Sequence, residues 1–207
     1  AYGIPQVPAL KAETADAAAS AAASLGFPVV LKVISPQLLH KSDAGGIRLN
    51  LTSACEVRNA YSEMMAALQD ARPEAQIEGA LVEKMAPRGQ EVIVGMRRDA
   101  GFGPLLMFGL GGIGVELFRD VAFRVAPITA REARDMIQQT HAGTLLNGFR
   151  GSAPADVDAV VDALLRLSQI ALDFPEIDEI EINPLIVYGR GQGALALDSR
   201  LIRSRIL

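Results

Sequence analysis

The chain has 207 residues, of which 50% are hydrophobic and 21% are charged, a balance typical of a globular protein with a substantial core. Its formal net charge of −4 argues against a protein that neutralises nucleic-acid phosphates over a broad face. The single cysteine, Cys55, excludes an internal disulfide and a cysteine-based zinc cluster and indicates a reducing cytoplasm, and no apolar stretch is long enough to predict a transmembrane helix.

The pattern of apolar residues, with its caps and turns, predicts strands and helices that do not alternate regularly. In chain order they are a helix over 14–25, strands over 29–34 and 47–51, a helix over 53–70, strands over 80–85, 90–97, 105–108 and 122–126, a helix over 129–140, the longest helix over 156–174, and strands over 178–188 and 194–198. Glu132 stands three residues after Thr129, the spacing of a capping box. The order predicts an α+β fold.

We expect this fold to form two lobes, residues 1–84 and 85–207, with a ligand-binding cleft between them. The chain opens AYGIPQVP, without Met and without a segment typical of a signal peptide. We therefore expect a domain or subunit of a larger protein, although removal of Met before Ala1 is an equally simple explanation.

Lys32 is a charged residue inside the otherwise apolar strand VVLKVI. Burial of an unpaired ammonium would cost several kcal/mol, so Lys32 needs an anionic partner. Either a nearby carboxylate or the phosphate of a ligand would serve.

His40 lies in the polar loop segment LHKSDAGG, which ends in Gly45 and Gly46. Paired glycines allow backbone N–H groups to turn toward an anion, and an imidazole can accept a phosphoryl group. An ordinary surface histidine beside a tight turn is the alternative. The other histidine, His141, follows a predicted helix, and we expect it to interact with the carbonyl groups at the helix end.

A second glycine-rich segment, GLGGIG, covers residues 109–114 and follows a predicted strand. Its glycines do not match the G-x-G-x-x-G pattern of a dinucleotide-binding fold. We interpret Gly111 and Gly112 as parts of a phosphate-facing loop, with a tight corner between a strand and a helix as the alternative.

The segments EIEINPL and ALALDS contain the strongest candidate metal site. The predicted hairpin brings Asn183 close to Asp198, and strand alternation places Glu179, Glu181 and Asn183 on one face. Mg²⁺ prefers such oxygen ligands, completed by phosphate and water. A solvated acidic face is the alternative.

Besides Lys32, the chain contains a series of motifs that follow one another along nearly its whole length. They are LHKSDAGG, VEKM, GQEVIVG, FGLGGIGVELFRDV, FRVAPI, LLNGFRG, and EIEINPL with LALD. With these motifs the chain resembles the ATP-grasp domain of NDP-forming acyl-CoA synthetases, relatives of the nucleotide-binding subunit of succinyl-CoA synthetase. The resemblance implies an ATP-grasp fold that holds ATP or ADP with Mg²⁺ between two α+β lobes.

The resemblance also implies roles for individual residues. Lys32 would contact nucleotide phosphates, Glu83 and Lys84 would meet adenine, Glu91 would lie near the nucleotide, Asn183 and Asp198 would bind magnesium, and His40 would carry phosphate as a relay. From their spacing, we expect Arg124 and Arg150 to steady the transferred phosphate.

We therefore expect one part of an ADP-forming acyl-CoA synthetase, an acid–thiol ligase. Its expected partners are a CoA-binding domain and a domain with a second phosphorylated histidine, on the same chain or on another subunit. We expect it to bind neither nucleic acid nor a membrane. A nucleotide-sensing regulatory domain of a fused lysine acetyltransferase is the first alternative. The second is an ATP-grasp ligase that makes an acyl phosphate without a carrier histidine.

Overall fold

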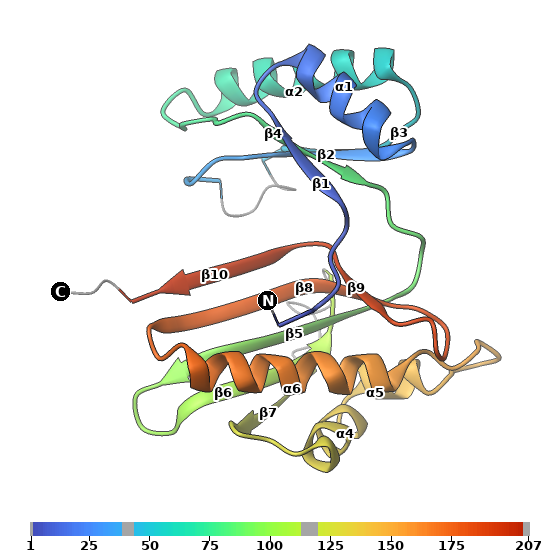
Figure 1. Ribbon diagram of the computed structural model, residues 1–207, viewed down its shortest axis with the longest axis vertical. Helices are drawn as coiled ribbons and strands as arrows, with labels where there is room; N and C mark the ends of the chain where they lie inside the picture. The colour runs from blue at the N-terminus through green and yellow to red at the C-terminus, as the bar shows by residue number, and fades with distance from the viewer. Residues whose placement is uncertain (1, 39–43, 113–119, 205–207) are drawn as a thin grey trace. The chain divides into compact units, whose positions relative to one another are not determined.

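The computed structural model describes residues 2–38, 44–112 and 120–204, which form two compact units (Figure 1). The smaller unit is Val7–Ala86, and the larger unit combines Ala1–Gln6 with Pro87–Leu207. Residues 1–6, expected in the first lobe, belong instead with the larger unit. Within this segment, Pro5 accepts a hydrogen bond from the Ala196 backbone N–H at 2.9 Å.

The smaller unit is a four-stranded antiparallel sheet in the order β1-β4-β2-β3, with both helices of the unit on one side (Figure 1). Its elements are β1 (Ala9–Ala12), α1 (Ala15–Leu25), β2 (Val29–Val33), β3 (Ile47–Leu51), α2 (Ala54–Ala71) and β4 (Ala80–Lys84). Alanines of α1 pack on the apolar stripe of α2 and on β2 and β4, and this contact forms the core of the unit.

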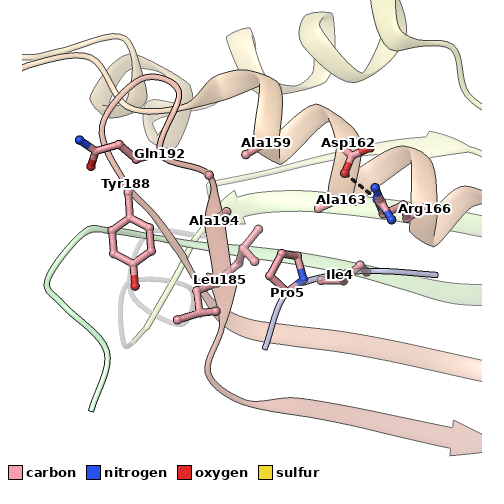
Figure 2. A pocket seen from close by; sticks show the side chains of 12 residues that line it. Ile4, Pro5, Ala159, Asp162, Ala163, Arg166, Leu185, Tyr188, Gln192 and Ala194 are labelled. Atoms are coloured by element: carbon pink, nitrogen blue, oxygen red, sulfur yellow. Dashed lines mark hydrogen bonds and ion pairs between the residues drawn. The ribbon is translucent and has the colours of Figure 1, made fainter. Parts of the chain in front are cut away.

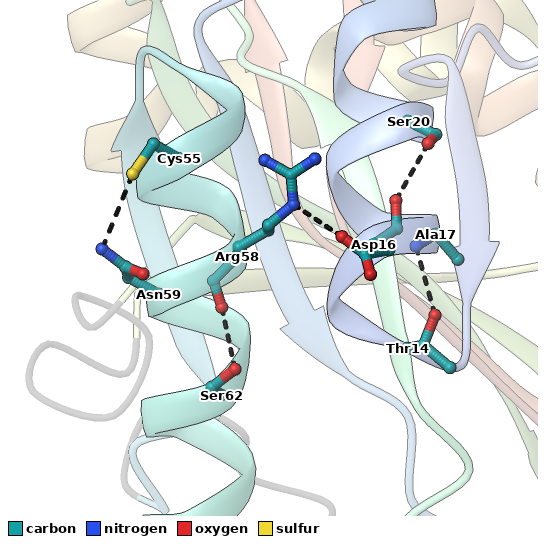
Figure 3. Close-up of polar contacts among 8 residues, drawn as sticks. All are labelled: Thr14, Asp16, Ala17, Ser20, Cys55, Arg58, Asn59 and Ser62. Carbon is teal, nitrogen blue, oxygen red and sulfur yellow. Dashed lines mark hydrogen bonds and ion pairs between the residues drawn. The ribbon is translucent and has the colours of Figure 1, made fainter.

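In the smaller unit, polar contacts cap the N-terminus of α1 and link α1 to α2 (Figure 3). Thr14 caps α1 by accepting a hydrogen bond from the Ala17 N–H at 3.2 Å. Arg58 of α2 donates from Nε to Asp16 of α1 at 2.6 Å, but both side chains are more than half exposed, so this pair contributes little stability.

The larger unit is a six-stranded antiparallel sheet in the order β10-β8-β5-β6-β7, with β9 also paired to β8, and its helices cover one face (Figure 1). Its strands are β5 (Gln90–Asp99), β6 (Gly103–Leu110), β7 (Val121–Val125), β8 (Ile177–Val187), β9 (Ala194–Ala196) and β10 (Ser199–Arg203), and its helices are α4 (Ala130–Gln138), α5 (His141–Leu146) and α6 (Val157–Asp173). The core lies between this face and the helices.

Most predicted elements are present within a few residues of their expected bounds, and the capping box of Thr129 and Glu132 is confirmed. The prediction missed β1, α5 and β10. It was also wrong about the longest helix, because α2 has 18 residues and α6 has 17. None of the helices in the described ranges combines the length and the apolar character needed to cross a bilayer.

Candidate functional site

In the smaller unit, Lys32 and Glu83 form a buried ion pair. The Lys32 Nζ lies 2.8 Å from Glu83 Oε2, and the two side chains are 11% and 8% exposed. Lys32 pairs in register with Leu81 and Glu83 with Val30, so the two charged residues are diagonal neighbours on one face of the β2–β4 ladder. The carboxylate partner expected for Lys32 is present, and it is itself a predicted nucleotide-binding residue.

Lys84 holds the end of α1 against β4. Its Nζ donates to the carbonyl oxygens of Gly26 at 2.7 Å and Phe27 at 2.9 Å. These carbonyls follow the last turn of α1, where a cation is favourable. The ammonium group of Lys84 therefore has a structural use within the smaller unit, separate from its predicted contact with adenine.

Gly45 and Gly46 lie beside the end of β2. The Gly46 carbonyl accepts a hydrogen bond from the Val33 N–H at 2.8 Å, one residue after Lys32. Gly45 has φ +70°, which glycine adopts at little cost, and none of the described residues would contact a Cβ there. His40, the predicted phosphate carrier, lies outside the described residues.

In the larger unit, Gly111 and Gly112 approach neighbouring strands too closely for a side chain. A Cβ on Gly111 would lie 2.7 Å from the backbone N of Val92, and one on Gly112 would lie 2.4 Å from Glu91 Oε2. The Gly111 N–H donates to the Glu91 carbonyl at 3.1 Å. These contacts bring two predicted phosphate-facing glycines to the predicted nucleotide residue Glu91.

The same glycine pair reaches the predicted metal ligands. The Gly112 N–H donates to Asn183 Oδ1 at 2.9 Å. The Asn183 N–H in turn donates to the Asp198 carbonyl at 3.1 Å, so the two ligands are neighbours, as the predicted hairpin requires. The structure thus collects five of the predicted site residues in the larger unit: Glu91, Gly111, Gly112, Asn183 and Asp198.

Glu179 and Glu181 share a face of β8 with Asn183, as the alternation predicts, but they face a basic partner. Arg200 of β10 lies opposite Glu181 and forms an ion pair with Glu179, and its Nη2 is 3.6 Å from Glu181 Oε2. In this structure both glutamates thus have a basic partner, and the predicted magnesium ligands are the other pair, Asn183 and Asp198.

The remaining pair of candidate ligands, Asn183 and Asp198, fits Mg²⁺. An amide oxygen and a carboxylate are the small number of hard protein ligands that this ion takes when phosphate and water fill its other positions. In the parts of the chain that the structure describes, no group of three or more His, Cys, Asp or Glu side chains is placed to hold a metal ion. A metal at this site would therefore depend on its phosphate ligand.

Arg124 and Arg150 lie apart from this set. Arg124 and the buried Ala122 lie on the same face of β7, and Arg124 donates from Nη2 to Gln139 at the end of α4, at 2.8 Å. Arg150 has φ 50°, and its guanidinium stacks over the Phe149 ring at 5.2 Å. The structure does not bring either arginine to Asn183.

His141 follows the end of α4, as predicted, but it also begins the next helix, and its recorded partner is a carboxylate and not the carbonyl groups of a helix end. It is the first residue of α5, and both its N–H and its Nδ1 lie 3.0 Å from Asp120 Oδ1. Burial raises the pKa of the Asp120 carboxyl, but the hydrogen bonds from residues 141 and 142 outweigh it, so the net pKa is lowered. The sequence gives no signal for this contact between distant segments.

A cavity of about 390 Å³ lies in the larger unit between α6, the β8–β9 hairpin and the N-terminal segment (Figure 2). Its lining is mainly apolar, with the Arg166–Asp162 ion pair at 2.6 Å among the labelled side chains. The hydroxyl of Tyr188, a residue of its lining, is buried and has no hydrogen-bond partner among the described residues, and burial raises the pKa of this group. No predicted site residue lines this cavity.

The chain matches known proteins along nearly its whole length. Residues 1–202 match the family model of an ATP-grasp domain. The chain is 45% identical to the β subunit of acetate–CoA ligase (ADP-forming) I from Pyrococcus furiosus, over 97% of this chain and 86% of that protein.

Two further matches agree with that result. The chain is 46% identical to acetate–CoA ligase (ADP-forming) I from Archaeoglobus fulgidus over 98% of this chain, and it spans 29% of that longer protein. Its structure is similar to a dinucleotide-forming acetyl-coenzyme A synthetase 1 from Ca. Korarchaeum cryptofilum, solved with coenzyme A and Ca-AMPCP, with a TM-score of 0.93, 47% identity and coverage of 98% of this chain and 88% of that one.

Proposed function

Because the chain belongs to the ATP-grasp family of acetate–CoA ligase (ADP-forming) β subunits, we propose that it binds ATP with Mg²⁺ and transfers phosphate for an acyl-CoA synthetase. The overall reaction would convert an acid, CoA and ATP into acyl-CoA, ADP and phosphate. A free and exposed Cys55 is compatible with action in a reducing cytoplasm.

The hydrogen bond from the Gly112 N–H to Asn183 Oδ1, at 2.9 Å, is the observation that carries this proposal. It joins a glycine pair, whose backbone can approach a phosphate, to a candidate metal ligand that lies beside Asp198. Phosphoryl transfer needs oxygen ligands for a metal beside the phosphates, and glycines, which have no Cβ, let a phosphate approach such a site closely.

Each residue set would contribute to charge neutralisation. Asn183 and Asp198 would hold Mg²⁺, which when bound supplies positive charge to the nucleotide phosphates. Lys32 would exchange part of its contact with Glu83 for a phosphate oxygen, so that its buried charge keeps an anionic partner throughout.

His40 would accept the terminal phosphoryl group. An imidazole nitrogen attacks the terminal phosphorus of ATP, the bond between that phosphorus and the bridging oxygen breaks, and ADP leaves with the bonding electrons. A carrier is required if acyl phosphate forms on a partner domain, because free phosphate would diffuse into water. The relative from Archaeoglobus fulgidus, of which this chain spans 29%, has room for such CoA-binding and histidine-bearing partner domains.

Labelling with γ-phosphate tests this function. The chain would be incubated with labelled ATP and Mg²⁺, alone and with its cognate partner subunit or domains. We expect acid-labile label on the chain that disappears in His40→Ala. Since the chain has only two histidines, His141→Ala is the matched control and should retain the label.

Two results would contradict the proposal. If the chain bound ATP tightly but carried no label, either alone or with its partner, it would act as a nucleotide sensor and not as a phosphoryl carrier. Full synthetase activity in His40→Ala would instead indicate a ligase that forms its acyl phosphate directly.

A further inference from the structure

Asp120 lies directly before β7, and its largely covered carboxylate is hydrogen-bonded to the start of α5. Its side chain is 9% exposed. Oδ1 accepts from the His141 N–H at 3.0 Å and lies 3.0 Å from His141 Nδ1, and Oδ2 accepts from the Ala142 N–H at 3.0 Å. Two of these donors are backbone groups, so the contact fixes the path of the main chain.

The backbone of Asp120 lies against the beginning of the glycine segment, which we define as residues 109–112. Val121 pairs in register with Gly109, and a Cβ on Gly109 would lie 2.4 Å from the Asp120 carbonyl oxygen. Gly109 can therefore approach Asp120 only because it has no side chain. Any shift of Asp120 would be passed directly to Gly109.

The other end of the glycine segment reaches the candidate metal ligand. Gly111 is held to the backbone of Glu91, and Gly112 donates to Asn183 Oδ1 at 2.9 Å. A continuous path of close contacts thus leads from the start of α5, through Asp120 and the glycine segment, to Asn183.

We propose that Asp120 is a positioning residue for phosphoryl transfer, which holds the glycine segment so that the Gly112 N–H and the Asn183 amide oxygen are correctly placed for a nucleotide and its metal. The inference rests on the proposed function. Asp120 acts through Gly109, Gly112 and Asn183 and needs no contact with the nucleotide itself. Hydrogen bonds to a carboxylate are stronger than those between neutral groups, which suits such an anchor.

Asp156 offers a matched control in the same unit. It is also a buried aspartate, 8% exposed, that caps a helix and holds a loop: it accepts from the Ala159 N–H at 3.2 Å and from the Gly193 N–H at 2.8 Å. No contact leads from Asp156 to the glycine segment among the described residues. Asp120→Ala and Asp156→Ala therefore both remove hydrogen bonds from a carboxylate to backbone N–H groups. Only the bonds of Asp120 lie next to the glycine segment.

Binding of Mg²⁺ and ATP to the whole chain, by calorimetry well below the unfolding temperature of each variant, tests the inference. We expect Asp120→Ala to weaken nucleotide binding about tenfold and to raise the Mg²⁺ concentration needed for half-maximal binding, as loss of one charge-assisted contact would. Asp156→Ala should bind nucleotide within about twofold of the unchanged chain, the scatter expected of a remote site.

The outcomes separate the inference from the proposed function. Equal effects of Asp120→Ala and Asp156→Ala, or no effect of either, would overturn the positioning role and leave the proposed function intact. If the unchanged chain did not bind Mg²⁺ and ATP, the proposed function itself would fail. If Asp120→Ala does not fold, Asp120→Asn replaces it in the test, because asparagine keeps one acceptor oxygen. Weaker binding of ATP and Mg²⁺ by Asp120→Asn would support the positioning role, and unchanged binding would overturn it.

Discussion

Two ion pairs, one in each unit, differ in how deeply their charges are buried. In the smaller unit, Lys32 and Glu83 form an ion pair whose side chains are 11% and 8% exposed. In the larger unit, Arg200 and Glu179 form a pair whose side chains are 45% and 21% exposed, with Glu181 beside them. The first pair is therefore almost closed off from water, whereas the second remains within reach of it.

Burial decides what each pair can do. Water solvates the exposed charges, so the Arg200 pair adds little stability and either partner can be lost. A buried charge that loses an ionic partner keeps its desolvation penalty, so removal of either Lys32 or Glu83 should cost more stability than removal of an exposed partner, unless another ion takes the vacated place. Because the buried ammonium group of Lys32 requires an anion, a phosphate would be as suitable a partner for it as a carboxylate is.

The largest effect is expected from breaking the buried pair. Lys32→Ala or Glu83→Ala should each destabilise the smaller unit by about 3–5 kcal/mol, because each removes one charge of a buried ion pair and leaves the other in its buried site. The double variant Lys32→Met with Glu83→Leu should recover most of that loss, since apolar groups of similar volume fill the site. Urea unfolding of all three variants measures the difference.

The double variant also separates stability from function. It should fold and yet bind ATP much more weakly, because no cation remains for the phosphates in β2. Normal ATP binding by the double variant would show that the pair is purely structural.

A smaller effect is expected at the glycine segment. Gly111→Ala would place a Cβ 2.7 Å from the backbone of Val92, which cannot move aside as a flexible side chain could. We expect a loss of stability of about 1–3 kcal/mol, typical of overpacking, together with weaker ATP binding. Thermal unfolding and calorimetry would measure the two losses.

Gly101→Ala is the control for this substitution. Gly101 lies in the β5–β6 turn, where a Cβ would make only an ordinary contact, 3.5 Å from Asp99 Oδ1. Gly101→Ala should leave both the stability and the ATP binding of the chain nearly unchanged. Equal losses in the two variants would mean that the segment around Gly111 has no special role.

Asn183→Ala should have a still smaller effect on stability, about 1 kcal/mol, since it removes one side-chain acceptor from the Gly112 N–H. The metal dependence of ATP binding should change more, because a predicted ligand is lost. Asn147→Ala, which removes a single bond of 2.9 Å to the Gly143 carbonyl, is the control for stability. An unchanged Mg²⁺ requirement in Asn183→Ala would argue against a metal role for Asn183.

Local features of this fold could be predicted from the sequence because their causes are local. Thr129 and Glu132 make both bonds of the capping box, and Thr14 and Ser53 cap α1 and α2, as their positions before apolar runs indicate. The proximity of Asn183 and Asp198 was also predictable, since one short turn joins their segments. In each case the interacting groups are close in the chain.

The features that the sequence did not reveal involve partners that are distant in the chain. Arg200 could not be assigned to Glu179 without the register of β10 on β8, and β10 itself was missed because SRLIR is a short edge strand exposed along its length. The bonds of Asp120 to α5 join residues 21 and 22 positions apart. Such contacts follow from tertiary packing, which periodicity does not encode.

The smallest effect is expected at the exposed pair, where Arg200→Ala should cost roughly 0.2–1 kcal/mol at low salt. About 1 M salt should remove most of this difference, because ions screen exposed charges, whereas it should change the loss in Lys32→Ala much less. Thermal unfolding of both variants at low and high salt makes the comparison. If the Arg200→Ala loss were large and insensitive to salt, this pair would behave as a buried one, and the contrast between the two units would not hold.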